Sequence, residues 1–171
     1  MIIFLVGMPG VGKSYWMKKL KRHYGCTAID LDQFIESETG ATIPELFLKS
    51  ENMFRQIEQE CLHKIIQQHK DESCVVSTGG GAPCFFDNMD LMLQQGVVIY
   101  LEGTPAFIHS RLTQSKIRRP MFENIAPEDR LAFIESLLAQ RVVFYEKSTY
   151  SFDALSVTMA NFAQLFSSLQ F

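Results

Sequence analysis

Apolar residues gather in short runs that are separated by longer stretches with helical spacing. The clearest runs are residues 2–6, 74–77 and 97–101. An apolar run without polar alternation is typical of a strand that is buried on both faces of a parallel sheet. We therefore expect strands at these three places, a short strand at 28–29 and a last strand near 151–154.

Helical periodicity fills the intervals between the runs. Between residues 50 and 69, apolar side chains recur every four positions, which predicts an amphipathic helix. Its stripe consists of Met53, Phe54, Ile57, Cys61, Leu62, Ile65 and Ile66. Thr42, Pro44 and Glu45 form the pattern of a capping box with proline in the first turn, which predicts a short helix there. Further helices are expected at about 13–23, before Gly96, after Thr104-Pro105, after Pro127 and up to about Leu169.

The alternation of strands and helices predicts the fold class. We expect a three-layer α/β/α protein in which helices cover both faces of a central parallel sheet. The chain has 171 residues, which is enough for one domain with its own core. Ligands of open sheets bind at the carboxyl ends of the strands. The candidate motifs lie at such places, at residues 7–14, 30–32 and 79–81.

Composition narrows the functional class. Hydrophobic residues make up 47% of the chain and charged residues 20%, as in globular proteins. The net charge of -3 argues against a nucleic-acid binder, and no run reaches the roughly 18 apolar residues of a membrane span. The apolar start has no basic leader and runs into a glycine loop, unlike a signal peptide. Four scattered cysteines without a CxxC pair favour buried side chains in a reducing compartment over a zinc site or disulfides.

Residues 7–14 match the pattern G-x-x-x-x-G-K-[ST] of a phosphate-binding loop. Its glycines let backbone N–H groups surround phosphate oxygens, and the helix that follows points its positive end at the same anion. We expect Lys13 to reach the β- and γ-phosphates of ATP and Ser14 to bind Mg²⁺. A dinucleotide site is the weaker alternative, because Tyr15 stands where its third glycine is required.

Two further motifs follow predicted strands. Asp30 and Asp32 are alternate residues of a segment that we expect to be extended, so their carboxylates would point the same way. One would hold a water of Mg²⁺, and the other would orient an acceptor hydroxyl and take its proton. The alternative is an ordinary helix N-cap. Residues 79–81 are three glycines that allow close approach of a ligand. Because no acidic residue follows that strand, Asp30 is expected to serve the metal.

Four arginines are candidates for anion binding. Taken alone, Arg55, Arg111 and Arg141 each favour an ordinary solvated helix face, where Arg55 would pair with Glu51 or Glu58. Arg119 differs because it lies in a basic segment without periodicity, at about 113–124. We expect this segment to be a mobile lid, which supplies charge at the transition state and excludes water.

In this order, the motifs resemble shikimate kinase, within the nucleoside monophosphate kinase-like group. The resemblance covers about residues 2–146. It is carried by residues 7–14, Asp30-Leu31-Asp32, Ile35-Glu36, Gly40, residues 43–47, Glu51, Phe54-Arg55, Glu58, residues 77–81, Arg111-Leu112, Arg119-Pro120, Arg141 and Tyr145. Two departures are Met121, where the family has leucine after Arg-Pro, and Val143, where it has proline. The region after Tyr150 is short and offers no clear contact for adenine.

The resemblance implies ATP-dependent phosphorylation of the 3-hydroxyl of shikimate, in the chorismate route to aromatic amino acids. It implies a single shikimate kinase-like domain with a core at 1–112 and 125–171, a lid at about 113–124 and an acceptor-binding region at about 32–60. The implied catalytic residues are Lys13, Asp32 and Arg119. The implied ATP contacts are Gly10, Val11, Gly12, Lys13, Ser14, Tyr15, Arg111 and Arg119. The implied shikimate contacts are Asp32, Arg55, Gly79, Gly80, Gly81 and Arg141, with the two guanidinium groups on the carboxylate.

The same resemblance implies one Mg²⁺ per subunit, held by Ser14 and, through water, by Asp30. It also implies a cytoplasmic monomer with no nucleic-acid or membrane partner. Two alternatives stay open: another metabolite kinase of the gluconate kinase type, and a nucleotide-binding homologue without transfer activity. A GTP switch is disfavoured, because the sequence contains neither Asn-Lys-x-Asp nor Asp-x-x-Gly after a strand.

Overall fold

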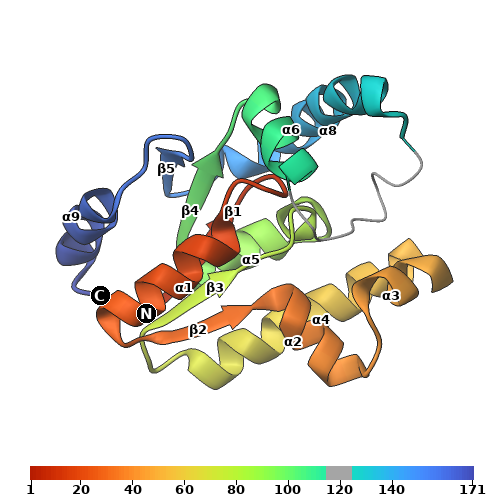
Figure 1. Ribbon diagram of the computed structural model, residues 1–171. Coiled ribbons are helices and arrows are strands. Elements are labelled where there is room, and N and C mark those ends of the chain that lie inside the picture. Colours follow the sequence, from red (N-terminus) through yellow and green to blue (C-terminus); the bar gives the residue numbers. More distant parts are fainter. Residues whose placement is uncertain (115–124) are drawn as a thin grey trace.

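The protein is built on one five-stranded parallel sheet. The computed structural model describes residues 1–114 and 125–171, and its strand order is β2-β3-β1-β4-β5 (Figure 1). The strands are β1 (Ile2–Val6), β2 (Thr27–Asp30), β3 (Cys74–Ser77), β4 (Gly96–Glu102) and β5 (Tyr150–Asp153). Every neighbouring pair is parallel. The predicted strands and the predicted parallel sheet are confirmed.

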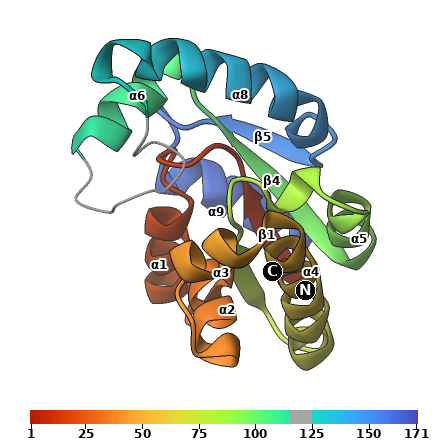
Figure 2. The same cartoon turned by 90° about the vertical axis from the view of Figure 1, so that its right-hand side faces the viewer.

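Helices form a layer on each face of the sheet. They are α1 (Lys13–Tyr24), α2 (Leu31–Thr39), α3 (Ile43–Lys49), α4 (Glu51–His69), α5 (Asn88–Gln95), α6 (Pro105–Gln114), α8 (Arg130–Tyr145) and α9 (Met159–Leu169), with 3₁₀ turns at Ala82–Cys84 and Pro127–Asp129. Helices α1 and α9 cover one face, and α4, α5 and α8 cover the other (Figures 1 and 2). The expected three-layer α/β/α architecture is therefore confirmed.

The core lies where the apolar runs predicted it. All residues of β1 and β3 are buried, because both strands have neighbours on each side and helices on each face. The edge strand β5 is mostly exposed. Helices α1 and α9 meet through aromatic rings, with the centroids of Trp16 and Phe162 4.8 Å apart. In residues 1–114 and 125–171 no helix is long and apolar enough to cross a membrane. The four cysteines are free, and three of them are buried.

Local sequence signals set several helix ends. Thr42 accepts a hydrogen bond from the backbone N–H of Glu45, and the Glu45 carboxylate accepts one from the backbone N–H of Thr42, which completes the predicted capping box of α3. Ser50 caps α4 through the N–H of Met53. Helix α1 ends at Gly25, whose φ of 68° is left-handed.

The expected extended conformation of residues 30–32 is wrong. Strand β2 ends at Asp30, which has β geometry, and α2 begins at Leu31, so Asp32 lies in the first helical turn. Asp is common in the first turn of a helix, because its charge complements the exposed N–H groups there. Asp30 occupies the N-cap position of the alternative interpretation, but its side chain makes no capping hydrogen bond. The helix after Pro127 also starts later than its proline suggests, since a 3₁₀ turn precedes Arg130.

Candidate active site

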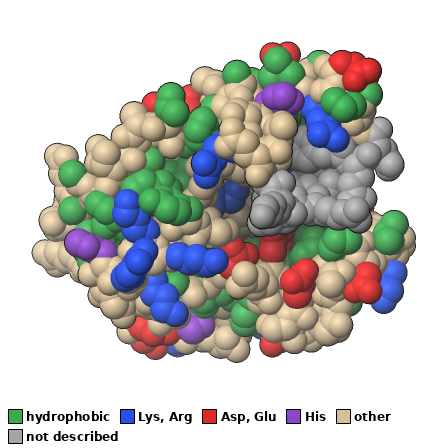
Figure 3. Space-filling model, viewed as in Figure 1, with side chains coloured by type: hydrophobic (Ala, Val, Ile, Leu, Met, Phe, Trp, Pro, Cys, Tyr) green, Lys and Arg blue, Asp and Glu red, His purple; other side chains and the backbone are tan. Residues whose placement is uncertain are grey.

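A cavity of about 390 Å³ opens at the carboxyl ends of β1, β2 and β3. It is lined by Pro9, Gly10, Gly12, Lys13, Ser14, Tyr15, Asp30, Asp32, Ser77, Thr78, Gly79, Gly80, Arg111, Leu112 and Gln114. In Figure 3, Lys and Arg side chains lie above and to the left of the central hollow, and acidic side chains lie along its lower edge. The three predicted motifs therefore meet in one place, although they are far apart in the sequence.

The glycine loop between β1 and α1 has the backbone shape that phosphate binding requires. Gly7, Gly10 and Gly12 have φ values of 133°, 90° and 102°, which other residues rarely adopt. A Cβ on Gly7 would also stand 2.6 Å from the carbonyl oxygen of Leu101. Val11, between the glycines, is buried and does not line the cavity. The loop can therefore turn its N–H groups inward at the positive end of α1.

Lys13 lies folded against this loop. Its Nζ donates to the carbonyl oxygens of Gly7 at 2.7 Å and Met8 at 2.9 Å. The side chain is buried, yet it lines the cavity. Its ammonium group is thus held at the floor of the site, within the loop that can surround a phosphate.

Ser14 and Asp30 provide two oxygen atoms side by side. Ser14 Oγ donates to Asp30 Oδ2 at 2.6 Å and lies 3.1 Å from Ser77 Oγ. Mg²⁺ prefers such oxygens and usually keeps several waters, with only one or two protein ligands. Within residues 1–114 and 125–171 there is no cluster of three His, Cys, Asp or Glu side chains that could hold a metal. The pair fits Mg²⁺ in the company of a nucleotide and water.

Each glycine of the triplet after β3 faces a different partner. A Cβ on Gly79 would stand 2.9 Å from Asp32 Oδ1 and 3.1 Å from Glu58 Oε1. On Gly80 it would stand 2.7 Å from the ring of Pro9, and on Gly81 it would stand 2.5 Å from Arg55 Nη2. These contacts leave no room for a side chain. The triplet is therefore a close-packed wall between the glycine loop and α4. The expected close approach of a ligand to these glycines stays a prediction.

Arg55 is buried in an ion pair. Only 5% of its surface is exposed, and its Nη1 donates to Glu58 Oε2 at 2.7 Å. Its Nη2 lies 3.4 Å from Glu51 Oε1. Its Nε has no hydrogen-bond partner among the described residues. The solvated helix face that the isolated sequence favours for Arg55 is wrong.

Glu58 is one of the most buried charged groups of the described chain, with 1% of its surface exposed. Burial raises its pKa to about 7, and the charge of Asp32 acts in the same direction. The charges of Arg55 and Arg141 and the hydrogen bond from Arg55 oppose this rise. Glu58 is therefore poised between its charged and neutral forms near neutral pH.

Arg141 approaches the same region from α8. It is 8% exposed, and among the described residues no carboxylate lies within 4.0 Å of it. One turn later, Tyr145 is fully buried and donates from its Oη to the carbonyl oxygen of Gly80 at 2.5 Å. Burial raises the pKa of Tyr145, and Arg141 opposes the shift. A buried guanidinium without a carboxylate partner suits an anionic ligand. For Arg141, too, the solvated face is wrong.

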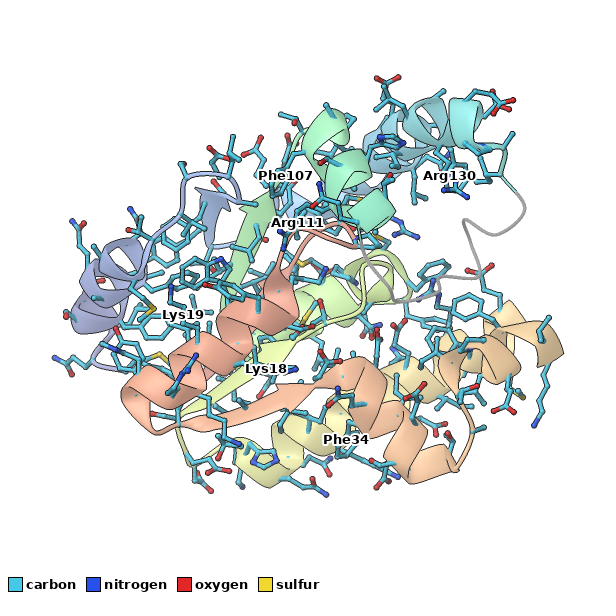
Figure 4. All side chains as sticks on the ribbon, viewed as in Figure 1. Lys18, Lys19, Phe34, Phe107, Arg111 and Arg130 are labelled. Carbon is cyan, nitrogen blue, oxygen red and sulfur yellow. The ribbon has the colours of Figure 1, made fainter. Side chains whose placement is uncertain are left out.

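The other end of the cavity is formed by α6. Arg111 is exposed, and it lines the cavity with Leu112 and Gln114. Figure 4 shows Arg111 on α6, close to the start of α1. Tyr15, on the first turn of α1, is 57% exposed at the same rim. Arg119 lies outside the described residues, as does the predicted lid beyond Gln114.

Several site residues were not among the predicted contacts: Ser77, Thr78, Leu112 and Gln114 line the cavity, and Glu58 and Pro9 pack at the glycine triplet. From the sequence, Glu58 is expected as a partner of Arg55 and as part of the family motif but has no assigned role, although it lies four residues after Phe54 and four before Leu62, on the apolar stripe of α4. That position is a usable signal, because an acid on a buried stripe needs a partner. Pro9 packs against Gly80, and no pattern in the sequence indicates this contact.

Comparison with known proteins identifies the family. A shikimate kinase family profile matches residues 9–168. The shikimate kinase of Phocaeicola vulgatus is 40% identical over 153 residues, which are 89% of this chain and 86% of that protein. The crystal structure of shikimate kinase from Bacteroides thetaiotaomicron covers 100% of this chain and 99% of its own at a TM-score of 0.90 and 34% identity. Shikimate kinase from Acinetobacter baumannii, solved in complex with shikimate, covers 98% of this chain and 91% of its own at a TM-score of 0.82 and 30% identity. The chain belongs to the shikimate kinase family.

Proposed function

We propose that this protein transfers the γ-phosphoryl group of ATP to the 3-hydroxyl of shikimate, in the chorismate route to aromatic amino acids. The observation that carries the proposal is the pair of buried arginines, Arg55 and Arg141, whose charges both act on Glu58. Neither lines the cavity itself, but Arg55 lies against the glycine triplet, which packs on Pro9 of the phosphate-binding loop. Guanidinium groups bind carboxylates through parallel hydrogen bonds, and shikimate is a carboxylic acid. A relative with 30% identity is known in complex with shikimate, which supports the same acceptor here.

The donor side uses the glycine loop. Backbone N–H groups of residues 10–15 would hold the phosphates, and Arg111 and Tyr15 would lie toward the nucleoside. Lys13 Nζ would exchange the carbonyl oxygens of Gly7 and Met8 for β- and γ-phosphate oxygens. This exchange needs no large movement, because both carbonyl groups belong to the loop itself.

The metal side uses Ser14 directly and Asp30 through a water molecule. Their oxygens, 2.6 Å apart, fit the donor set of Mg²⁺. When bound, Mg²⁺ neutralises charge on the phosphates. Asp30 would give up its hydrogen bond from Ser14 Oγ, so that the hydroxyl oxygen faces the ion and the carboxylate faces its water.

On the acceptor side, Arg55 and Arg141 would hold the carboxylate, and the wall of residues 79–81 would pack against the ring of shikimate. Asp32 would accept the proton of the 3-hydroxyl. The bond between the γ-phosphorus and the β,γ-bridging oxygen breaks, a bond to the 3-oxygen of shikimate forms, and the proton passes to the carboxylate. Asp32 lines the same cavity as Lys13, which supports this role.

The remaining assignments rest on the family. We assign residues 32–60 to acceptor binding and 113–124 to a lid, whose Arg119 would stabilise charge on the γ-phosphate in the transition state. Arg119→Ala should therefore lower kcat far more than it raises the KM for ATP. An unchanged kcat would remove that role. We further assign the protein to the cytoplasm, as a monomer.

A coupled ADP assay tests the function directly. The purified chain with Mg-ATP should release ADP on addition of shikimate, and it should not respond to gluconate. Activity on gluconate alone would favour the other metabolite kinases. ATP binding in calorimetry without transfer to any acceptor would indicate a homologue without transfer activity. Either result would overturn the proposal.

A further inference from the structure

The guanidinium group of Arg55 is packed among aromatic rings. Its Cζ lies 4.0 Å from the centroid of Phe85, 5.0 Å from that of Phe54 and 5.2 Å from that of Phe47. Phe54 is on α4 and Phe47 is on the preceding helix α3, and their ring centroids lie 4.3 Å apart. Phe85 comes from a different segment, the turn after the glycine triplet, and it makes the closest ring contact.

That turn is fixed to both the triplet and α4. The N–H of Cys84 donates to the carbonyl oxygen of Gly81 at 2.8 Å, and the buried Asn88 side chain donates to that of Ala82 at 3.0 Å. Asp87 accepts a hydrogen bond of 2.6 Å from Gln59, which lies one helical turn after Arg55. Several independent contacts therefore hold the Phe85 ring in place over α4.

The aromatic ring and the hydrogen-bond acceptors use different parts of the Arg55 guanidinium: the ring contacts its flat face, and the acceptors lie along its edge. A ring centroid 4.0 Å from Cζ attracts the cation through the negative face of the aromatic ring. Hydrogen bonds leave a guanidinium along its edge, in its own plane. Along that edge Glu58 accepts from Nη1 at 2.7 Å and Glu51 from Nη2 at 3.4 Å, whereas Nε has no partner among the described residues. The ring can thus restrain the group, while Nε and the weaker, 3.4 Å contact at Nη2 are the donors that a carboxylate of the acceptor could take.

The chain conformation next to Phe85 is unusual. Phe86 has a φ of 51°, in the left-handed region that residues other than glycine seldom adopt. Its side chain is 53% exposed, whereas Phe85 is only partly exposed. Residues held in such conformations persist where the surroundings fix them, and they gather at ligand sites. The turn therefore directs one phenylalanine onto Arg55 and leaves the next one in solvent.

We propose that Phe85 is a positioning residue that holds the Arg55 guanidinium in the plane needed to bind the carboxylate of the acceptor. This inference rests on the proposed function, because the carboxylate is that of shikimate. It assigns to Phe85 a part in selecting acidic acceptors over neutral ones. Phe85 itself acts through Arg55 and takes no part in phosphoryl transfer.

The test compares shikimate with its methyl ester, in which the carboxylate charge is absent. For each variant, kcat/KM is measured with both acceptors at saturating Mg-ATP. Phe85→Leu should lower the acid-to-ester ratio about five- to tenfold, through the KM for shikimate, with kcat and the KM for ATP within about twofold of the wild type. Phe85→Tyr keeps an aromatic face and should restore the ratio. Phe86→Leu is the matched control and should leave it unchanged.

The outcomes separate the two proposals. A wild-type chain that binds ATP but transfers nothing to shikimate would overturn the proposed function itself. If the wild type is active and Phe85→Leu lowers both acceptors equally, or neither, the positioning role is overturned while the function stands. Thermal unfolding of each variant shows whether the fold is kept. If Phe85→Leu is unstable, Phe85→Tyr and Phe85→Met are compared instead, and a ratio that Met preserves as well as Tyr contradicts the proposal.

Discussion

Arg55 and Glu58 form a 2.7 Å ion pair that is almost wholly removed from water, with 6% and 1% of their side-chain surfaces exposed. Lys64 of the same helix forms a second pair of equal length with Glu38 of α2, and these side chains are 53% and 39% exposed. Burial of two charges costs free energy that their attraction repays only with good geometry. The buried pair is therefore better explained by the site it supports than by stability, while the exposed one needs no such reason.

The buried pair and the exposed pair should differ in how much they contribute to the free energy of unfolding. Glu58→Ala leaves the Arg55 cation buried without its main partner and should lower the free energy of unfolding by about 3 kcal/mol. Glu38→Ala removes a partner that water replaces, so it should change stability little. Urea unfolding of both variants at neutral pH measures the difference. Equal losses in the two variants would mean that burial of Glu58 does not govern the energy of its pair.

Glu58 also predicts how stability depends on pH. Its pKa is about 7 in the folded chain and near 4.5 in the unfolded chain, so the folded chain holds more protons between these values. Proton binding by Glu58 therefore stabilises the folded chain. This contribution to the free energy of unfolding is complete below about pH 4.5 and is lost as pH rises through 7, by up to about 3 kcal/mol. Glu58→Gln removes this titration. Urea unfolding at pH 5 and pH 8 should show a smaller decline in the variant, and an equal decline would contradict the assignment to Glu58.

The sequence predicted the parts of the fold that depend on local pattern. Buried strands appear as apolar runs, as at residues 2–6, and the capping box at Thr42 marks the start of a helix in any fold. The glycine loop placed the site, because the order of strand, loop and lysine-bearing helix has few other uses. These signals act within a few residues of the chain, so no tertiary information is needed to read them.

Other features depend on how elements pack, and the sequence could not give them. An arginine three residues before a glutamate looks the same on a solvated helix and on a buried one, so the burial of Arg55 depends on the wall of residues 79–81 against α4. The convergence of Asp30 and Asp32 was expected for the wrong reason. Both line the cavity, although the chain turns into α2 between them.

Lys13 offers a direct test of the phosphate site. Lys13→Ala removes the cation expected at the β- and γ-phosphates, and kcat with shikimate should fall about a hundredfold or more. Lys18→Ala is the control, because Lys18 is an exposed residue of the same helix and does not line the cavity (Figure 4). Steady-state ADP release measures both. Normal turnover in Lys13→Ala would show that the loop does not hold the transferred phosphate.

Asp30 should determine how much Mg²⁺ the reaction requires. Asp30→Asn keeps the size of the side chain but removes the charge beside Ser14, so the Mg²⁺ concentration that gives half-maximal rate should rise about tenfold. The KM for shikimate should stay the same. Titration with MgCl₂ at fixed ATP measures this, and Asp71→Asn, an exposed acid far along the chain, is the control. A Mg²⁺ requirement like that of the wild type would place the ion elsewhere.

Gly81 tests whether the wall of the triplet sets the position of Arg55. A Cβ there would stand 2.5 Å from Arg55 Nη2 and 2.8 Å from Nη1, so Gly81→Ala must push the guanidinium away from its place beside Glu58. The KM for shikimate should rise about tenfold or more, while calorimetry should show ATP binding unchanged, because the nucleotide loop is not touched. Gly25→Asn is the control, since nothing lies within 4 Å of that glycine and asparagine tolerates its left-handed backbone. If Gly81→Ala binds shikimate as the wild type does, the guanidinium can shift without loss, and the carboxylate must be held chiefly by Arg141.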